Sequence, residues 1–362
     1  MYFDTDVKKV NEKFLYTGQK KCSKITFFIK NHPYIFWGVI IGIVVLIIVI
    51  IALAFGLSKT SKDEETETED ENEGIFPLSE KSLKEVMNIY DGIGDKDKGT
   101  LSQFCEYLKS NASNLKEAQK VYLVYSWITK NIVYDHEGLE KDTVIYDPDK
   151  FFPTRKTVCS GYARLFRRLL KEMNYNETKI KNIQGYSKGA GYSVYVLPKA
   201  NHEWNAVNIN GQWCSVDTTW DAGKNSSVFY YLCTRPECFV RDHLPNNEED
   251  QFLPSPISLN TFHSLAWTNG KFCYYNGEIN EDKSYYNFCG KRKFTVKYDL
   301  DYETQLHINQ IKDVSFQISN ITKGFQVELS VEKAGKYQLS LFLADENLKP
   351  QHIGYIHINC EK

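Results

Sequence analysis

The dipeptide Asn210-Gly211 is the strongest local constraint on the fold of this chain. A two-residue type I′ turn needs positive φ at both central positions, which Asn-Gly tolerates well. Runs of alternating polar and apolar residues flank the dipeptide, so a β-hairpin with a fixed register is predicted. If Ile209 pairs with Gln212, then Trp204 lies directly across from Asp217.

The two faces of this predicted hairpin differ in chemistry. His202 falls one diagonal step from Asp217 on the same face, within reach of an imidazole and a carboxylate. The other face carries Val207, Ile209, Cys214 and Val216 and is expected to pack in the core. A histidine on a strand is more often a surface or core residue than a base, but the shared face with Asp217 favours a functional pair.

A helix is predicted to begin near Cys159, because apolar residues recur there at intervals of three and four: Tyr162, Leu165, Phe166, Leu169, Leu170 and Met173. Cys159 then lies in the first turn, with Thr157 as the expected N-cap. Unpaired amides at a helix start favour a thiolate over a thiol. A buried or disulfide-bonded cysteine is the alternative. Together with His202 and Asp217, however, Cys159 completes a nucleophile, a base and an orienting carboxylate.

The sequence blocks around these three residues resemble those of a known family. Cys-Ser-Gly-Tyr-Ala at 159–163, His-Glu-Trp-Asn at 202–205 and Val-Asp-Thr-Thr-Trp-Asp at 216–221 look like the Cys, His and Asp blocks of the transglutaminase-like superfamily. Residues 121–135 resemble the helix and strand that precede the cysteine block. Segments within 231–259 are similar to the extension in proteins of the kyphoscoliosis-peptidase type.

The resemblance implies an α+β fold with a papain-like transglutaminase core. Cys159 would be the nucleophile, His202 the base and Asp217 the orienting carboxylate, with Trp204 and Trp220 at the substrate cleft. The implied activity is acyl transfer on protein or peptide carbonyls by a protease, a deamidase or a transglutaminase. The alternative is a catalytically silent scaffold or adhesion module. No cofactor or metal is expected, because the sequence shows neither a calcium-loop pattern nor a close Cys-x2-Cys pair.

Residues 34–57 carry no charge and are dominated by Ile, Val and Leu. At about 1.5 Å per residue this run is long enough to span a bilayer of about 30 Å, whereas a secretory signal peptide has a shorter apolar core. Lysines are concentrated before the run, at positions 8, 9, 13, 20, 21, 24 and 30. Four N-glycosylation sequons follow it, at Asn111, Asn176, Asn225 and Asn320. A single-pass type II membrane protein is expected, with residues 34–57 in the lipid bilayer and the cysteine site extracellular or lumenal.

The chain is therefore divided into five predicted segments: a cytosolic tail (1–33), a transmembrane helix (34–57), an acidic disordered stalk (58–76), a transglutaminase-like domain (77–267) and a β-sandwich (268–362). Alternating apolar residues from Phe325 onward predict an all-β, immunoglobulin-like region that binds a protein partner or positions a substrate. The formal net charge of -2 gives no reason to expect nucleic acid as a partner.

Eight of the nine cysteines follow the apolar run. Some are expected to pair in an oxidising compartment. Cys233–Cys238 and Cys273–Cys289 are the nearest in sequence, but spacing does not fix connectivity. Setting Cys159 aside leaves an odd number, so at least one further thiol is expected to be free or to pair between chains.

Overall fold

The computed structural model describes residues 75–189, 191–223, 228–280, 282–297, 305–308, 313–321, 323–344 and 351–361. The predicted tail, the predicted membrane span and residues 58–74 of the predicted stalk lie outside these ranges. Among the described helices, none combines the length and apolarity that a bilayer crossing requires. Residues 72–362 form one compact unit.

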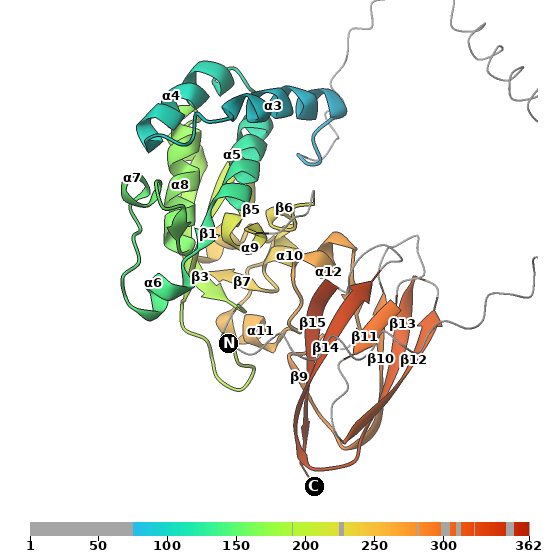
Figure 1. Ribbon diagram of the computed structural model, residues 1–362. Coiled ribbons are helices and arrows are strands. Elements are labelled where there is room, and N and C mark those ends of the chain that lie inside the picture. Colours follow the sequence, from blue (N-terminus) through green and yellow to red (C-terminus); the bar gives the residue numbers. More distant parts are fainter. Residues whose placement is uncertain are drawn as a thin grey trace, which may run out of the picture. The chain divides into compact units, whose positions relative to one another are not determined.

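Helices make up most of residues 75–174 (Figure 1). They are α3 (Glu80–Ile93), α4 (Leu101–Ala112), α5 (Glu117–Asn131), α6 (His136–Glu140), α7 (Pro148–Phe151) and α8 (Cys159–Glu172). Two short strands, β1 (Val133–Tyr134) and β2 (Lys156–Thr157), pair in parallel between them. The strand β2 ends just before α8, so it fixes where that helix begins.

A five-stranded antiparallel sheet follows, in the order β6-β5-β4-β3-β7. Its strands are β3 (Ile180–Ser187), β4 (His202–Ile209), β5 (Gln212–Val216), β6 (Leu232–Thr234) and β7 (His243–Pro245). Short helices precede, connect or follow these strands: η2 (Glu177–Lys179), α9 (Thr218–Asp221), α10 (Pro236–Phe239), η3 (Glu248–Gln251) and α11 (Leu259–Ser264).

The hairpin of β4 and β5 has the predicted register. Ile209 pairs with Gln212 and Ala206 with Ser215, and Asn210 takes a positive φ of 51° at the turn. The predicted apolar face packs with α5 and α8 in one hydrophobic cluster. The residues of this face are Val207, Ile209, Cys214 and Val216. The amphipathic stripe of α8 covers this face of the sheet, so the core prediction is confirmed.

The remaining strands form two four-stranded sheets, in the orders β12-β13-β10-β8 and β11-β14-β15-β9. The helix α12 (Gly270–Tyr274) precedes β8 (Glu278–Ile279), β9 (Tyr285–Asn287), β10 (Gly290–Lys297), β11 (Gln305–Ile308), β12 (Val314–Ile321), β13 (Gly324–Val331), β14 (Gly335–Ala344) and β15 (Gln351–Cys360). Side chains of both sheets share one core, which includes Phe294, Val327 and Ile356. Taking β8 as strand A, this order corresponds to the A-B-E-D and C-F-G sheets of immunoglobulin domains, with β9 as an additional strand parallel to β15.

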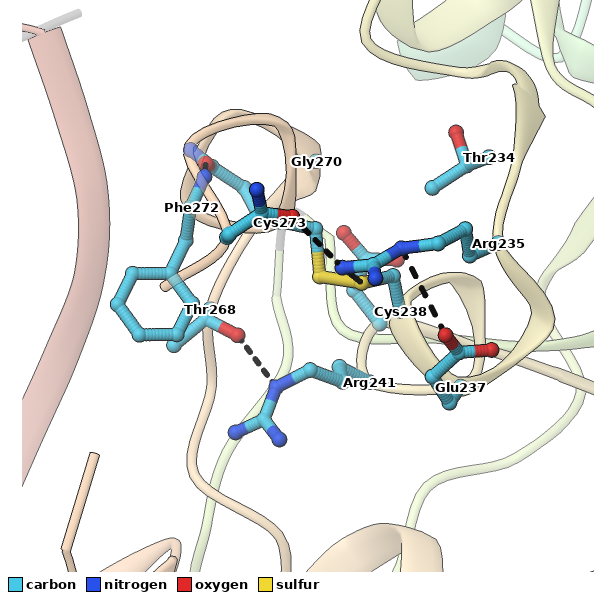
Figure 2. Close-up of a disulfide and its surroundings, with 12 residues drawn as sticks. Thr234, Arg235, Glu237, Cys238, Arg241, Thr268, Gly270, Phe272 and Cys273 are labelled. Atoms are coloured by element: carbon cyan, nitrogen blue, oxygen red, sulfur yellow. Dashed lines mark hydrogen bonds and ion pairs between the residues drawn. A yellow bond between two sulfur atoms is a disulfide. The ribbon is translucent and has the colours of Figure 1, made fainter. Parts of the chain in front are cut away.

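Three disulfides join Cys214 to Cys233, Cys238 to Cys273, and Cys289 to Cys360. None of them joins the pairs that are nearest in sequence, because strand pairing and helix packing bring more distant cysteines together. Figure 2 shows the Cys238–Cys273 bridge between α10 and α12. Among the described residues Cys105 and Cys159 are free, which agrees with the expected odd thiol.

Candidate functional site

Cys159 is the first residue of α8 and is partly exposed. The N-cap is Val158, which provides no side-chain cap, so the prediction of Thr157 as the cap was wrong. Thr157 ends β2, and its hydroxyl donates to the carbonyl of Ile145 instead. The strand pairing of β1 with β2 takes precedence over the capping preference of threonine, yet Cys159 still lies where helix amides favour an anion.

His202 is the first residue of β4 and forms a hydrogen bond with the Cys159 side chain. Burial by itself raises the pKa of the Cys159 thiol, but the bond to His202 and its charge outweigh burial, and the pKa is lowered. Burial lowers the pKa of His202, whereas the charge of Asp217 and bonds to Asp217 and Cys159 raise it well above its ordinary value. These opposite shifts favour a thiolate–imidazolium pair.

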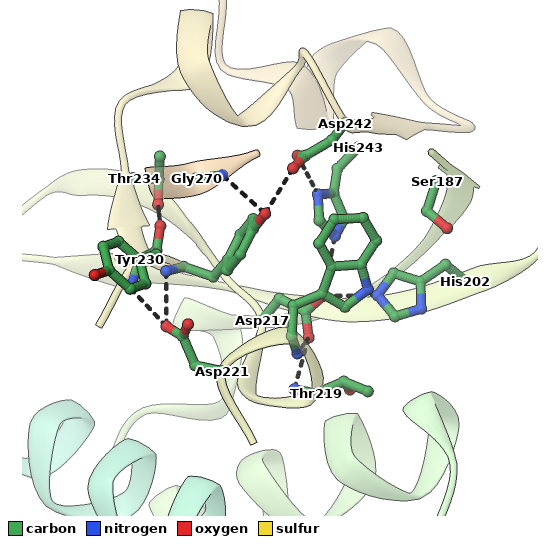
Figure 3. Close-up of polar contacts among 12 residues, drawn as sticks. Ser187, His202, Asp217, Thr219, Asp221, Tyr230, Thr234, Asp242, His243 and Gly270 are labelled. Atoms are coloured by element: carbon green, nitrogen blue, oxygen red, sulfur yellow. Dashed lines mark hydrogen bonds and ion pairs between the residues drawn. The ribbon is translucent and has the colours of Figure 1, made fainter. Parts of the chain in front are cut away.

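Asp217 follows β5 and caps α9. Its Oδ2 lies 2.7 Å from Nε2 of His202, so the ring nitrogen left for Cys159 is Nδ1. Its Oδ1 accepts backbone hydrogen bonds from Thr219 at 2.7 Å and Trp220 at 3.3 Å. Despite complete burial, the charge and hydrogen bond of His202 hold the pKa of Asp217 far below its usual range. The three predicted residues are thus brought together in one chain of contacts, of which Figure 3 shows the part between His202 and Asp217.

The two tryptophans predicted at the cleft lie in different surroundings. Trp204 is only 1% exposed and stacks on His202 with a ring distance of 5.8 Å, so it forms the wall behind the imidazole and is not open to solvent. Trp220 is partly exposed and lines a cavity of about 510 Å³. Its ring also lies 5.8 Å from that of His202. Trp220 therefore connects the site with a cavity, whereas Trp204 shields the His–Asp pair.

Sequence reasoning gave no role to Asp242 and His243. In the structure His243 Nε2 lies 3.0 Å from Oδ2 of Asp217, and His243 Nδ1 lies 2.7 Å from Oδ1 of Asp242. The hydroxyl of Tyr231 donates to the other oxygen of Asp242 at 2.7 Å. The pair lies in the segment that resembles the kyphoscoliosis-peptidase extension, and this was its only signal in the sequence.

A second missed residue is Lys188, which is fully buried at the wall of the cavity that Trp220 lines. Burial lowers its pKa to about 7, with repulsion by Arg241 as a further cause. Its Nζ donates to the carbonyl of Leu265 at 2.8 Å and lies over the ring of Phe262. The cavity wall thus carries an amine that is easily neutralised near physiological pH.

His202, Asp217 and His243 could together hold a metal ion, since their ligand atoms lie within 4.8 Å of one another. However, Nε2 of His202 and Nε2 of His243 already contact the same oxygen, Oδ2 of Asp217. A metal would have to replace the protons in these two hydrogen bonds. The geometry accordingly fits a proton-linked network better than a preformed metal centre.

Known proteins are similar in sequence to the part of the chain that carries this site. The family model described as transglutaminase-like superfamily matches residues 102–218, a range that contains Cys159, His202 and Asp217. The chain carries a transglutaminase-like domain. The family recognised from the three sequence blocks is therefore confirmed, and the mixed helix and sheet architecture is that of a transglutaminase-like fold.

Curated relatives of the transglutaminase-like chain include two kyphoscoliosis peptidases. The mouse protein is 29% identical over 241 residues, which cover 62% of this chain and 36% of the mouse protein. The human protein is 33% identical over 169 residues, covering 43% of this chain and 25% of the human protein. Hillarin of Drosophila melanogaster is 29% identical over 217 residues, which cover 53% of this chain and 25% of Hillarin. The chain thus spans 36% of the length of the mouse protein and 25% of the lengths of the human protein and Hillarin.

Proposed function

We propose that this protein is a cysteine acyl-transfer enzyme acting on protein or peptide carbonyls. The observation that carries the proposal is the contact chain from Cys159 through His202 to Asp217, with 2.7 Å between imidazole and carboxylate. A nucleophile, a base and an orienting carboxylate in this order are the groups that acyl transfer through a thioester requires.

The reaction has two steps. The Cys159 sulfur forms a bond to the carbonyl carbon, and His202 gives its proton to the leaving nitrogen as the carbon–nitrogen bond breaks. Water or an amine then attacks the thioester carbon and passes a proton to His202, while the carbon–sulfur bond breaks. Asp217 holds the imidazole tautomer throughout. Water as the acceptor gives a protease or deamidase, and an amine gives a transglutaminase.

A silent scaffold or adhesion module is the second candidate, and the burial of the site favours it. The His202 side chain is only 6% exposed, and Cys159 is only partly exposed. A carbonyl substrate must reach both groups, so an enzyme of this geometry has to admit the substrate past Trp220 or open locally. A scaffold has no such requirement.

Alkylation separates the two candidates, with Cys105 as an internal control. Cys105 is buried, and burial raises the pKa of its thiol to about 11. The full-length chain would be treated with iodoacetamide near pH ~6, where only an activated thiol reacts quickly, and analysed by peptide mass spectrometry. Selective labelling of Cys159 supports the enzyme. Equal inertness of both thiols would favour the scaffold.

The acyl acceptor is found with a second experiment. Candidate surface proteins would be incubated with the wild-type chain and with Cys159→Ala, and their peptides compared by mass spectrometry. Cleavage, a deamidation mass shift or isopeptide cross-links seen only with the wild type would identify the reaction. The absence of all three from an alkylation-competent chain would restrict the substrate to a class outside the proteins tested.

The β-sandwich positions a protein substrate or partner beside this site. Gln338, Tyr355 and His357 of β14 and β15 line the same cavity as Trp220 and Lys188. A partner that contacts the sandwich could thereby place a side chain next to the triad. This arrangement supports a positioning role for an immunoglobulin-like module without chemistry of its own.

Membrane anchoring through residues 34–57, with the cysteine site outside or in a lumen, is also part of this proposal. The uncharged run and the lysine asymmetry support it. The three disulfides lie in the part of the chain that would then face an oxidising compartment.

A further inference from the structure

Asp217 accepts hydrogen bonds from two imidazoles at the same oxygen. Nε2 of His202 and Nε2 of His243 lie 2.7 Å and 3.0 Å from its Oδ2. His243 is the first residue of β7 and is fully buried. Figure 3 shows it next to Asp217 and close to His202, with Asp242 at its other ring nitrogen. The two imidazoles therefore lie side by side against one oxygen of the orienting carboxylate.

The hydrogen-bond pattern determines the protonation of His243. Its two ring nitrogens each face a carboxylate oxygen, from Asp217 and from Asp242. An ionised carboxylate only accepts hydrogen bonds, so each nitrogen must carry a hydrogen and the ring is an imidazolium. The charges of the two carboxylates compensate the cation in the interior.

The surroundings of His243 contain few other titratable groups. His202 of β4 lies 5.3 Å away between ring centroids, and Tyr231 lies 5.5 Å away. The neighbouring rings of Trp204, Trp220 and Phe239 carry no charge. Burial by itself lowers the pKa of His243, but the two carboxylates raise it above its ordinary value.

We propose that His243 is a positioning residue for acyl transfer, a permanently charged imidazolium that fixes the Asp217 carboxylate and, anchored by Asp242, limits how strongly Asp217 retains the proton on His202. The inference rests on the proposed function. Two backbone amides fix Oδ1 of Asp217 and two imidazoles fix Oδ2, so the carboxylate has no freedom to rotate.

The charge on His243 also affects the proton that His202 must release. A positive charge beside Asp217 and close to His202 offsets part of the attraction that Asp217 exerts on the His202 proton. Removing it would raise the pKa of His202 and move the pH–rate profile to higher pH. One unit charge at about 5 Å and an effective dielectric constant of about 20 corresponds to a shift of about two and a half pH units.

The variant test compares His243→Gln with the wild type, using p-nitrophenyl acetate as an activated acyl donor. The amide of Gln keeps a neutral donor toward Asp217 but removes the charge. We expect kcat to fall about ten- to a hundred-fold with KM unchanged, and the pH profile to move upward. His352→Gln is the matched control, because His352 is a partly buried histidine of the sandwich whose pKa is lowered to about 4 by desolvation. Lower activity with an unmoved profile would reduce His243 to a packing residue.

A second measurement uses only the wild-type chain, so it does not depend on whether a variant folds. Nitrogen-15 spectra of the histidine-labelled full-length chain at pH ~8 should show two rings with both nitrogens protonated, from His202 and His243. Alkylation of Cys159 should perturb one of them and leave the other. Finding no doubly protonated ring besides that of His202 would overturn the inference. If p-nitrophenyl acetate and iodoacetamide both fail to react while the second imidazolium persists, the proposed function fails and the assignment of His243 stands.

Discussion

At the scale of single residues, two buried carboxylates on the same short helix have different partners. Asp217 accepts hydrogen bonds from the imidazoles of His202 and His243 and from backbone amides at the start of α9. Asp221, one turn later, accepts from the Tyr125 hydroxyl at 2.7 Å and from the backbone amides of Tyr230 and Tyr231. In the proposed mechanism the first carboxylate orients His202, and the second ties the segment before β6 to α5.

This difference predicts opposite outcomes for two matched substitutions. Asp217→Asn places an amide N–H opposite an imidazole N–H or forces the wrong tautomer, so turnover should fall by about 10⁴-fold, as in other triads. Asp221→Asn should instead lower the free energy of unfolding by about 1–3 kcal/mol, because one of its acceptor positions is lost. Steady-state kinetics with p-nitrophenyl acetate and thermal melting separate the two. Similar turnover in both variants would exclude an orienting role for Asp217.

At the scale of secondary-structure elements, the β4–β5 hairpin separates chemistry from packing. Val216 is fully buried against α5 and α8, while the next residue, Asp217, belongs to the proposed triad. Because side chains alternate along a strand, a shift of one residue would exchange the two. The Asn210-Gly211 turn prevents this shift by fixing the register.

Charge substitutions in β5 test this separation. Val216→Asp buries an unpaired carboxylate, which should cost several kcal/mol and leave the chain unfolded at 37 °C. Gln212→Asp, at an exposed position of the same strand, should change the free energy of unfolding by about 0.5 kcal/mol or less. Circular dichroism melts provide the comparison. A folded Val216→Asp chain would contradict the assigned faces.

Strand β15 carries a histidine whose burial makes the sandwich sensitive to acid. His357 is 8% exposed, and burial lowers its pKa to about 4. Its unfolded pKa is about 6.5, so between these values the unfolded chain binds a proton that the folded chain does not. Stability is therefore complete above pH ~6.5 and declines as the pH falls toward ~4, by at most about 3 kcal/mol for this group.

The measurement is the melting temperature at neutral pH and near pH ~4.5 for the wild type and His357→Gln. The variant lacks this titrating group, so its melting temperature should fall less on acidification than that of the wild type. The same fall in both chains would show that His357 does not remain neutral in the folded state.

At the scale of the whole molecule, three disulfides and a lysine-rich sequence before residues 34–57 support one topology. We expect protease added outside intact cells, or outside sealed vesicles of matching orientation, to cleave the chain beyond residue 58. Non-reducing gels should show the disulfides in the same material. Complete protection of the transglutaminase-like domain, with an accessible N-terminal tag, would reverse the proposed orientation.

The sequence predicted the hairpin register and the pairing of His202 with Asp217 because both depend on neighbours a few residues apart, whereas the family and the role of Cys159 came from the resemblance of three separate sequence blocks. Asn210-Gly211 determines its own turn, and the periodicity after Cys159 determines which face of α8 is buried. His202 and Asp217 belong to the same hairpin, so their proximity follows from its register. The N-cap prediction failed at Thr157 because a pairing partner distant in sequence, β1, decides where β2 ends.

Tertiary structure alone decided the partners that come from separate elements. His243 reaches Asp217 only because β7 pairs with β3 at the far edge of the sheet, and the cysteine connectivity follows from strand and helix packing. Neither leaves a local pattern, since contacts between elements depend on how whole layers bury their apolar faces. The sequence by itself determined the hairpin, the α8 helix and three candidate reacting groups; the fold decided which buried charges surround them.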